Sequence, residues 1–189
     1  MLQPLEIEKE IEHLQASLDE LRPPRPAETW LGALEVVDRI DRFGRYHYIG
    51  PGAERILGFP RAHYESEIGW VRFNHPEDVW RTAILWQKAL AGSPCTSFEY
   101  RTNDVEGRWV WLQDSLRPLE LDRQGHAVLV EGRWRDITMR KRREAEFLLR
   151  QWEWVLRHGG PVPGEGAAQR AASGRVVPFR CGLPGRSAR

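Results

Sequence analysis

The sequence offers few residues whose type and surroundings suit catalysis. His158 is the candidate for a phosphate-accepting histidine, because it follows a stretch with helical periodicity. A phosphoacceptor needs to lie within a helix beside a carboxylate base, whereas the segment Gly159-Gly160-Pro161 ends the helix directly after His158. No glycine-rich nucleotide loop or paired acidic metal site follows in the sequence. We therefore expect no catalytic residue and no enzymatic activity.

Cysteine chemistry is equally sparse. Cys95 and Cys181 are far apart and lack the spacing of metal ligands. The sequence therefore suggests neither a disulfide scaffold nor a zinc site, and we expect no bound metal.

The basic run Arg140-Lys141-Arg142-Arg143 is the candidate for binding nucleic acid. Glu144 and Glu146 follow it and can pair with it across helical turns, which favours a solvated helix face. The 28 basic and 27 acidic residues give a net charge of +1, which argues against a nucleic-acid partner held by bulk charge. The alternative predicts an affinity that falls steeply with salt.

The apolar residues do not form a membrane segment. No run approaches the ~20 apolar residues that span a bilayer. The first residues are acidic, with Glu6, Glu8, Glu10 and Glu12, and do not resemble a signal peptide. We expect a soluble, cytoplasmic protein that makes no membrane contact.

Two helices with an apolar seam flank the central part of the chain. Their seam residues alternate spacings of four and three, which is typical of coiled coils. The seams consist of Ile7, Ile11, Leu14, Leu18 and Leu21, and of Ala145, Leu149, Trp152 and Leu156. Two heptads are marginal alone, so we expect a homodimer through these helices. The alternative is a helix that lies on its own domain.

Between these helices, alternating apolar residues and turn signals predict a mixed fold. The expected strands cover residues 34–40, 46–49, 96–102, 108–119 and 126–137, and the expected helices 53–57, a segment after Pro60, 66–73 and 76–90. Glycines and aspartates between the strands indicate tight turns.

The order and spacing of short sequence words in residues 30–138 resemble the PAS domain family. The words are Asp41-Arg42-Phe43-Gly44, Ala53 to Phe59, Trp70, Asn74-His75-Pro76-Glu77-Asp78, Phe98-Glu99-Tyr100-Arg101, Gly107-Arg108-Trp109-Val110, Asp122-Arg123-Gln124-Gly125 and Asp136-Ile137-Thr138 with Arg140-Lys141. The resemblance implies an α+β fold with a five-stranded antiparallel sheet and helices on one face. Residues 1–22 then form the N-terminal helix, 23–29 a linker and 139–158 the exit helix.

The resemblance also implies a small-molecule pocket between the sheet and the helices. The candidate lining residues are Ile40, Ile49, Ile56, Phe59, Trp70, Phe73, Ile84, Phe98 and Tyr100. The alternative is that these apolar side chains simply fill the core.

The cofactor is unknown, and two familiar ones are disfavoured. A haem-binding member needs an axial ligand, most often a histidine on the long helix, but residues 76–92 contain none. His47 and His63 lie elsewhere, and His75 suits a helix start. Light-sensing flavin chemistry needs a cysteine near residues 66–73, where none occurs. We expect no cofactor.

The junction Asp136-Ile137-Thr138 changes from strand to helix periodicity within a few residues, with Asp136 or Thr138 as the helix N-cap. We expect it to relay ligand or partner binding from the core to the exit helix. The resemblance makes an ion pair between Asp136 and Arg140 the candidate latch.

The resemblance therefore implies a sensory and dimerisation module of a bacterial-type signalling protein, with a downstream domain or protein as partner. Two alternatives stay open: the input fragment of a histidine kinase or diguanylate cyclase, and a structural dimerisation module without a ligand. Residues 159–189 have no apolar period, and we expect them to be disordered. A stand-alone sensor, a truncated product and a changed reading frame after about residue 156 all remain compatible with that tail.

Overall fold

The computed structural model describes residues 3–23, 35–66 and 73–159. Its elements are α1 (Pro4–Glu20), β1 (Val36–Asp41), β2 (Tyr46–Ile49), α2 (Gly52–Leu57), α3 (Arg61–Ser66), α4 (Pro76–Leu90), β3 (Cys95–Asn103), β4 (Trp109–Leu121), β5 (Ala127–Asp136) and α5 (Thr138–His158). Trp70, most of the expected 23–29 linker and nearly all of the C-terminal tail lie outside the described residues. Across the described ranges, no helix is both long enough and apolar enough to cross a bilayer.

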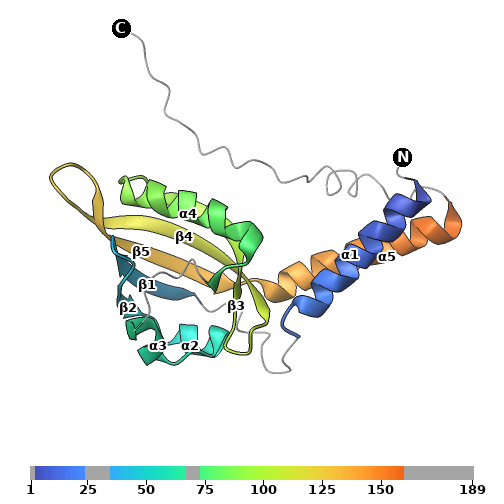
Figure 1. The fold of residues 1–189 in the computed structure, drawn as a ribbon, viewed down its shortest axis with the longest axis horizontal. Helices are drawn as coiled ribbons and strands as arrows, with labels where there is room; N and C mark the ends of the chain where they lie inside the picture. The colour runs from blue at the N-terminus through green and yellow to red at the C-terminus, as the bar shows by residue number, and fades with distance from the viewer. Residues whose placement is uncertain (1–2, 24–34, 67–72, 160–189) are drawn as a thin grey trace, which may run out of the picture.

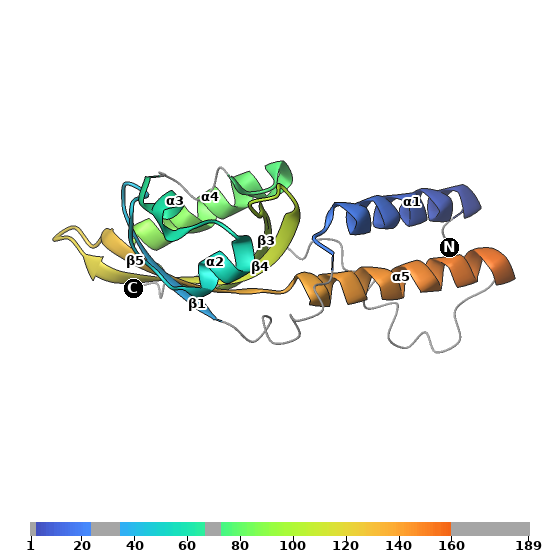
Figure 2. The same cartoon turned by 90° about the horizontal axis from the view of Figure 1, so that it is seen from below.

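The five strands form one antiparallel sheet in the order β2-β1-β5-β4-β3. Helices α2, α3 and α4 cover one face of the sheet (Figure 1 and Figure 2). The expected α+β fold is therefore confirmed. The last strand, β5, is central, because β1 and β4 pair with its two edges.

Three hairpin turns share one local design, an aspartate followed three residues later by a glycine. In each turn an aspartate oxygen accepts two backbone N–H groups, as Asp104 Oδ1 does from Glu106 and Arg108 at 3.0 Å each. The glycine adopts a positive φ, which side chains disfavour. The turns begin at Asp41, Asp104 and Asp122 and contain Gly44, Gly107 and Gly125. Short sequence words thus determine the register of most of the sheet.

Strand β4 shows how alternation builds the core. Val110, Leu112, Asp114 and Leu116 are buried on the face that the helices cover, whereas Trp109 and Trp111 are half-buried on the other face. Because successive side chains point to opposite faces, one strand contributes both to the core and to an outer aromatic surface.

Helices α1 and α5 lie side by side and antiparallel, away from the sheet (Figure 2). The seam of the N-terminal helix packs on the exit helix of the same chain. The alternative prediction, a helix that lies on its own domain, therefore describes part of this packing. Ile7 and Leu21 are buried there, while Ile11, Leu14 and Leu18 remain partly exposed. The residues of the α5 seam are also only half-buried.

Candidate functional site

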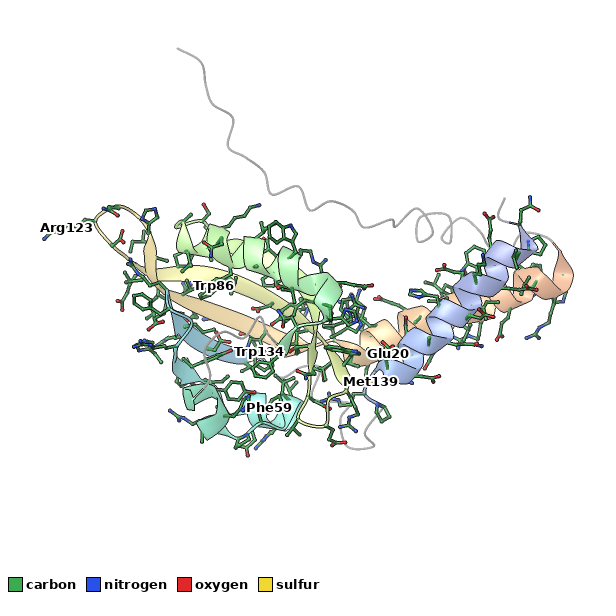
Figure 3. All side chains as sticks on the ribbon, viewed as in Figure 1. Glu20, Phe59, Trp86, Arg123, Trp134 and Met139 are labelled. Carbon is green, nitrogen blue, oxygen red and sulfur yellow. The ribbon has the colours of Figure 1, made fainter. Side chains whose placement is uncertain are left out.

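A cavity of about 50 Å³ lies between the sheet and the short helices. Figure 3 shows Trp134 on the sheet and Phe59 beside the short helices, and both side chains line this cavity. The lining residues are Asp38, Ile40, Tyr46, Leu57, Phe59, His63, Tyr64, Phe73, Asn74, Tyr100, Thr102, Asn103, Leu112, Asp114, Leu116 and Trp134. Aromatic rings thus surround two carboxyl groups.

The structure places only some of the expected pocket residues at the cavity. Those that line it are Ile40, Phe59, Phe73 and Tyr100. Ile49, Ile56 and Phe98 are buried in the core nearby and do not line it. Ile84 corrects the prediction: it is 40% exposed, because α4 packs on the sheet through the face that carries Thr82, Leu85 and Ala89. Trp70 lies outside the described residues.

Asp38 is buried at the cavity wall, where its carboxyl group accepts two hydrogen bonds. Its Oδ2 accepts the indole N–H of Trp134 at 2.9 Å, and its Oδ1 accepts the backbone N–H of Gly132 at 3.2 Å. A Cβ at position 132 would collide with Asp38 Oδ1, so the glycine makes room for the carboxyl group. Burial raises the pKa of Asp38 to about 6, although the hydrogen bonds from Trp134 and Gly132 oppose the increase.

Asp114 is the second acid of the cavity. Its Oδ2 accepts the hydroxyl group of Tyr100 at 3.3 Å. Burial and, next, the charge of Asp38 raise the pKa of Asp114 well above its ordinary value. On either side of β5, Asp38 pairs with Gly132 and Asp114 with Trp134, which places both acids on the inner face of the sheet.

Sequence reasoning missed the polar residues of the cavity. His63 lies outside the long helix, as expected, and was not among the predicted pocket residues, yet it lines the cavity and stacks on Phe59 with ring centroids 4.3 Å apart. Tyr64 is next to it on the same short helix and also lines the cavity. The one available signal was the spacing of four between Phe59 and His63, which is weak because Phe59 precedes the six-residue helix α3.

The other residues weighed for chemistry have structural positions. His75 is the N-cap of α4, and its Nδ1 accepts the N–H of Glu77 at 3.3 Å, as a helix start requires. Cys95 is buried at the first residue of β3. His158 is the last residue of α5, before Gly159 in a left-handed conformation. Among the described residues, no group of three or more histidine, cysteine or acidic side chains is placed to hold a metal ion.

The predicted latch between Asp136 and Arg140 is wrong. Asp136 is buried and pairs instead with Arg22, which follows α1 and is 3% exposed. The guanidinium group of Arg22 also donates to the carbonyl of Ile56 in α2, and its backbone N–H donates to the carbonyl of Trp109 at 3.0 Å. The N-terminal segment therefore meets the strand-to-helix junction at Asp136.

Arg140 belongs to a different ion-pair cluster on the outer face. Glu99 of β3 forms ion pairs with Arg140 at 2.5 Å and with Lys141 at 2.7 Å. Burial of Glu99 disfavours its charge, but hydrogen bonds from Lys141 and Arg140 outweigh this effect and lower its pKa. Lys141 also lies 4.8 Å from the ring centroid of Trp111. The basic run thus ties α5 to the sheet as well as pairing with Glu144.

The junction itself is continuous and hydrogen-bonded. The helix begins at Thr138, so the N-cap is Ile137 and not Asp136 or Thr138 as predicted. Asp136 Oδ1 still accepts the N–H of Thr138 at 2.7 Å. Trp111 of β4 donates its N–H to Thr138 Oγ1 at 2.9 Å and accepts the N–H of Ile137 at 2.8 Å. Sheet pairing therefore continues up to the first residue of the helix.

Comparison with known proteins agrees with this architecture. Residues 46–133 match the PAS fold family. The N-terminal domain of a diguanylate cyclase with PAS/PAC sensor from Marinobacter aquaeolei is 25% identical, with a TM-score of 0.51, over 57% of this chain and 99% of that chain. A sensory box histidine kinase/response regulator from Burkholderia thailandensis is 22% identical, with a TM-score of 0.53, over 68% of this chain and 94% of that chain. The comparison with curated proteins found no match. The sheet order, the helices on one face and the family match together show that the chain contains a PAS fold domain, with residues 46–133 as the matched part.

Proposed function

We propose that the protein is a sensory and dimerisation module of a bacterial-type signal-transduction protein, which relays the state of its cavity to the α1 and α5 helices. The observation that carries the proposal is the position of Trp134 and Asp136 on β5. They are two residues apart on one strand and therefore face the same side. Trp134 lines the cavity, and Asp136 holds Arg22 beneath α1.

The relay has few steps. A ligand that contacts Trp134 or Asp38 competes for the hydrogen bond between them. A shift of β5 then moves Asp136, which contacts both Arg22 and the first turn of α5. Arg142 of α5 also donates to the carbonyl of Leu18 in α1 at 2.8 Å, so the two helices respond together. A ligand with different affinities for two such arrangements shifts their populations.

Apolar side chains that the helix pair leaves exposed support a homodimer. Phe147 on α5 is 51% exposed and Leu5 on α1 is 62% exposed, and the seam residues beside them are only partly covered. A second copy of the pair would bury these side chains in a helical bundle. In the proposed dimer each copy contributes a helix pair, because α1 and α5 pack together within the chain.

The output of the module is proposed from its relatives. Structures similar to this chain include the sensor part of a diguanylate cyclase and a sensory histidine kinase/response regulator. We propose that this chain is not itself an enzyme and acts on such an output domain or on a separate partner protein. Genomic sequence that encodes a catalytic domain after Leu156 would favour the input-fragment alternative.

Hydrogen exchange tests the relay through a change confined to the cavity. Trp134→Phe removes the hydrogen bond to Asp38 and should change the exchange protection of α1 by several-fold. In an Arg22→Met background the same substitution should leave α1 unaffected, because the connection is absent. Trp80→Phe is the matched control, since Trp80 on α4 is 76% exposed.

Unchanged protection of α1 in Trp134→Phe would contradict the relay. Native mass spectrometry and an absorption spectrum of gently purified protein then distinguish a ligand sensor from a structural dimerisation module. A bound small molecule supports the sensor, and a ligand-free dimer supports the structural alternative.

A further inference from the structure

The two acids at the cavity differ from the other buried acids of this protein. Six carboxylates are buried among the described residues, and four of them pair with arginine. These pairs are Asp78 with Arg101, Asp104 with Arg108, Glu131 with Arg117, and Asp136 with Arg22. The hydrogen-bond donors to Asp38 and Asp114 in the described structure are neutral: Trp134, Gly132 and Tyr100, with the backbone N–H groups of Ser115 and Arg133 beside Asp114. The unpaired acids are the ones that line the cavity.

The electrostatics of the cavity favour a positive charge. Burial raises the pKa of both acids, and the described lining residues include no lysine or arginine. His63 is the basic residue among them, and it stacks on Phe59. A buried carboxylate without a cationic partner is costly, and a cation that enters the cavity removes that cost.

Unsatisfied polar atoms at the same cavity independently indicate a ligand. Tyr64 is 8% exposed and its hydroxyl group has no hydrogen-bond partner in the described structure. Asn74 is 5% exposed; its Nδ2 donates to Thr82 Oγ1 at 3.1 Å, while its Oδ1 has no such partner. Asn103 Oδ1 also has no hydrogen-bond partner in the described structure. These atoms can all accept hydrogen bonds, so they suit a ligand with several N–H donors.

The walls and the size of the cavity further restrict the charge and the size of the ligand. Aromatic ring faces attract cations, and the rings around the cavity belong to Tyr46, Phe59, Tyr64, Phe73, Tyr100 and Trp134. A volume of about 50 Å³ is roughly a third of an engineered cavity that holds benzene. The space therefore suits a group of two or three non-hydrogen atoms, and an ammonium group supplies three donors in that space.

We propose that the cavity binds a compact organic ammonium ion, a protonated primary amine of two or three non-hydrogen atoms. This inference rests on the proposed sensory role of the cavity and assigns its ligand class. The ammonium group lies between Asp38 and Asp114 and donates to them, while the ring faces contact the short alkyl part. Binding changes the hydrogen bond between Trp134 and Asp38, which is the first step of the relay.

Nuclear magnetic resonance of the Trp134 indole N–H tests the proposal, with Trp134→Phe to assign the signal. Ethylammonium chloride at constant ionic strength should shift the signal saturably. Ethanol, a neutral molecule of the same size, and acetate, an anion, should not. Butylammonium should bind at least 10-fold more weakly, because the cavity is too short for it. The affinity for ethylammonium should rise at least 10-fold between pH 5 and pH 8 as Asp38 loses its proton.

Asp114→Asn provides the decisive variant. It keeps an acceptor for Tyr100 and removes the charge, so ethylammonium affinity should fall at least 10-fold while the thermal midpoint at pH 8 does not fall. Glu120→Gln, an exposed acid on the same strand, should bind as the wild type does. Equal shifts with ethanol and ethylammonium, or unchanged binding in Asp114→Asn, overturn the proposal.

The proposed sensory role and the proposed ammonium ligand can be disproved separately. A neutral or anionic ligand found by native mass spectrometry overturns the ammonium ligand and leaves the sensory role intact. Ethylammonium binding without any change in α1 exchange supports the ligand class and contradicts the relay.

Discussion

At the scale of single residues, the buried acids of the protein have two kinds of surroundings. Asp136 and Asp104 are stabilised by arginine, which compensates for their removal from water. Asp38 receives two neutral hydrogen bonds, and Gly132 leaves space for its carboxyl group. An aspartate without a cationic partner in a core is destabilising when charged, so its presence indicates a use other than stability.

Asp38 gives the free energy of unfolding a specific pH dependence. Its pKa is about 6 in the folded protein and 3.8 in the unfolded chain, so the folded state binds the proton more tightly. The stabilisation is complete below about pH 4 and is lost as the pH rises through about 6. Between pH 5 and pH 8 we expect Asp38 to contribute a loss of about 1 kcal/mol, and Asp114 to add to it in the same direction. Urea unfolding across this range measures the slope.

Asp38→Asn should flatten that slope, whatever it does to the stability at a single pH. The groups that face Asp38 are Tyr46, His63, Tyr64, Tyr100 and Asp114 at the cavity, with Glu131 on the next strand. Acids whose pKa is lowered, such as Glu99 and Glu131, are already ionised above pH 5 and do not alter the slope. A wild-type slope in Asp38→Asn would show that another group is responsible.

At the scale of elements, the junction of β5 and α5 is a meeting point of three segments. Strand β4 binds it through Trp111, β5 leads into it, and Arg22 brings the end of α1 to it. Because Arg22 also contacts the Ile56 carbonyl, the short helix α2 is linked to the same point. The contacts of Arg22 and Asp136 therefore connect the first turn of the exit helix to the base of α1.

The two arginines near Asp136 should differ strongly in their effect on stability. Arg22→Met leaves Asp136 buried without a partner and should lower the free energy of unfolding by about 3–5 kcal/mol. Arg140→Met disrupts a partly exposed pair with Glu99 and should cost less than about 1 kcal/mol. Denaturant unfolding measures both. Adding Asp136→Asn should recover much of the loss in Arg22→Met and change the Arg140→Met value little. Equal coupling of Asp136 to both arginines would contradict the structure.

The elements were predictable from sequence because their signals are local. Gly58 ends α2, Pro76 begins α4, and the three turns that start at Asp41, Asp104 and Asp122 determine their own geometry. The partner of Asp136 was not predictable, because Arg22 is 114 residues away in sequence and Arg140 is four. His63 was missed for a similar reason. Which side of a six-residue helix faces the sheet depends on tertiary packing, not on the helix itself.

At the scale of the whole molecule, a sensor core and a helix pair meet at one end (Figure 1). The pair is held together within the chain by apolar contacts and by Arg142, which donates to the carbonyl of Leu18. The outward side chains Leu5 and Phe147 remain exposed. A dimer built on them would bury apolar surface without breaking the contacts within each chain.

Phe147→Ser therefore separates dimerisation from folding. Because Phe147 is 51% exposed in the single chain, the substitution should leave helix content and the thermal midpoint of the monomer nearly unchanged. It should raise the dimer dissociation constant at least 10-fold, since about 1.5–3 kcal/mol of burial energy is lost with each aromatic side chain. Light scattering over a range of concentrations measures this constant. Trp80→Ser, at a 76% exposed aromatic residue on α4, is the control that should dimerise normally. A dimer that survives Phe147→Ser but dissociates in Trp80→Ser would place the interface on the α4 surface instead of on the helix pair, and the relay would then have to reach a partner through the core.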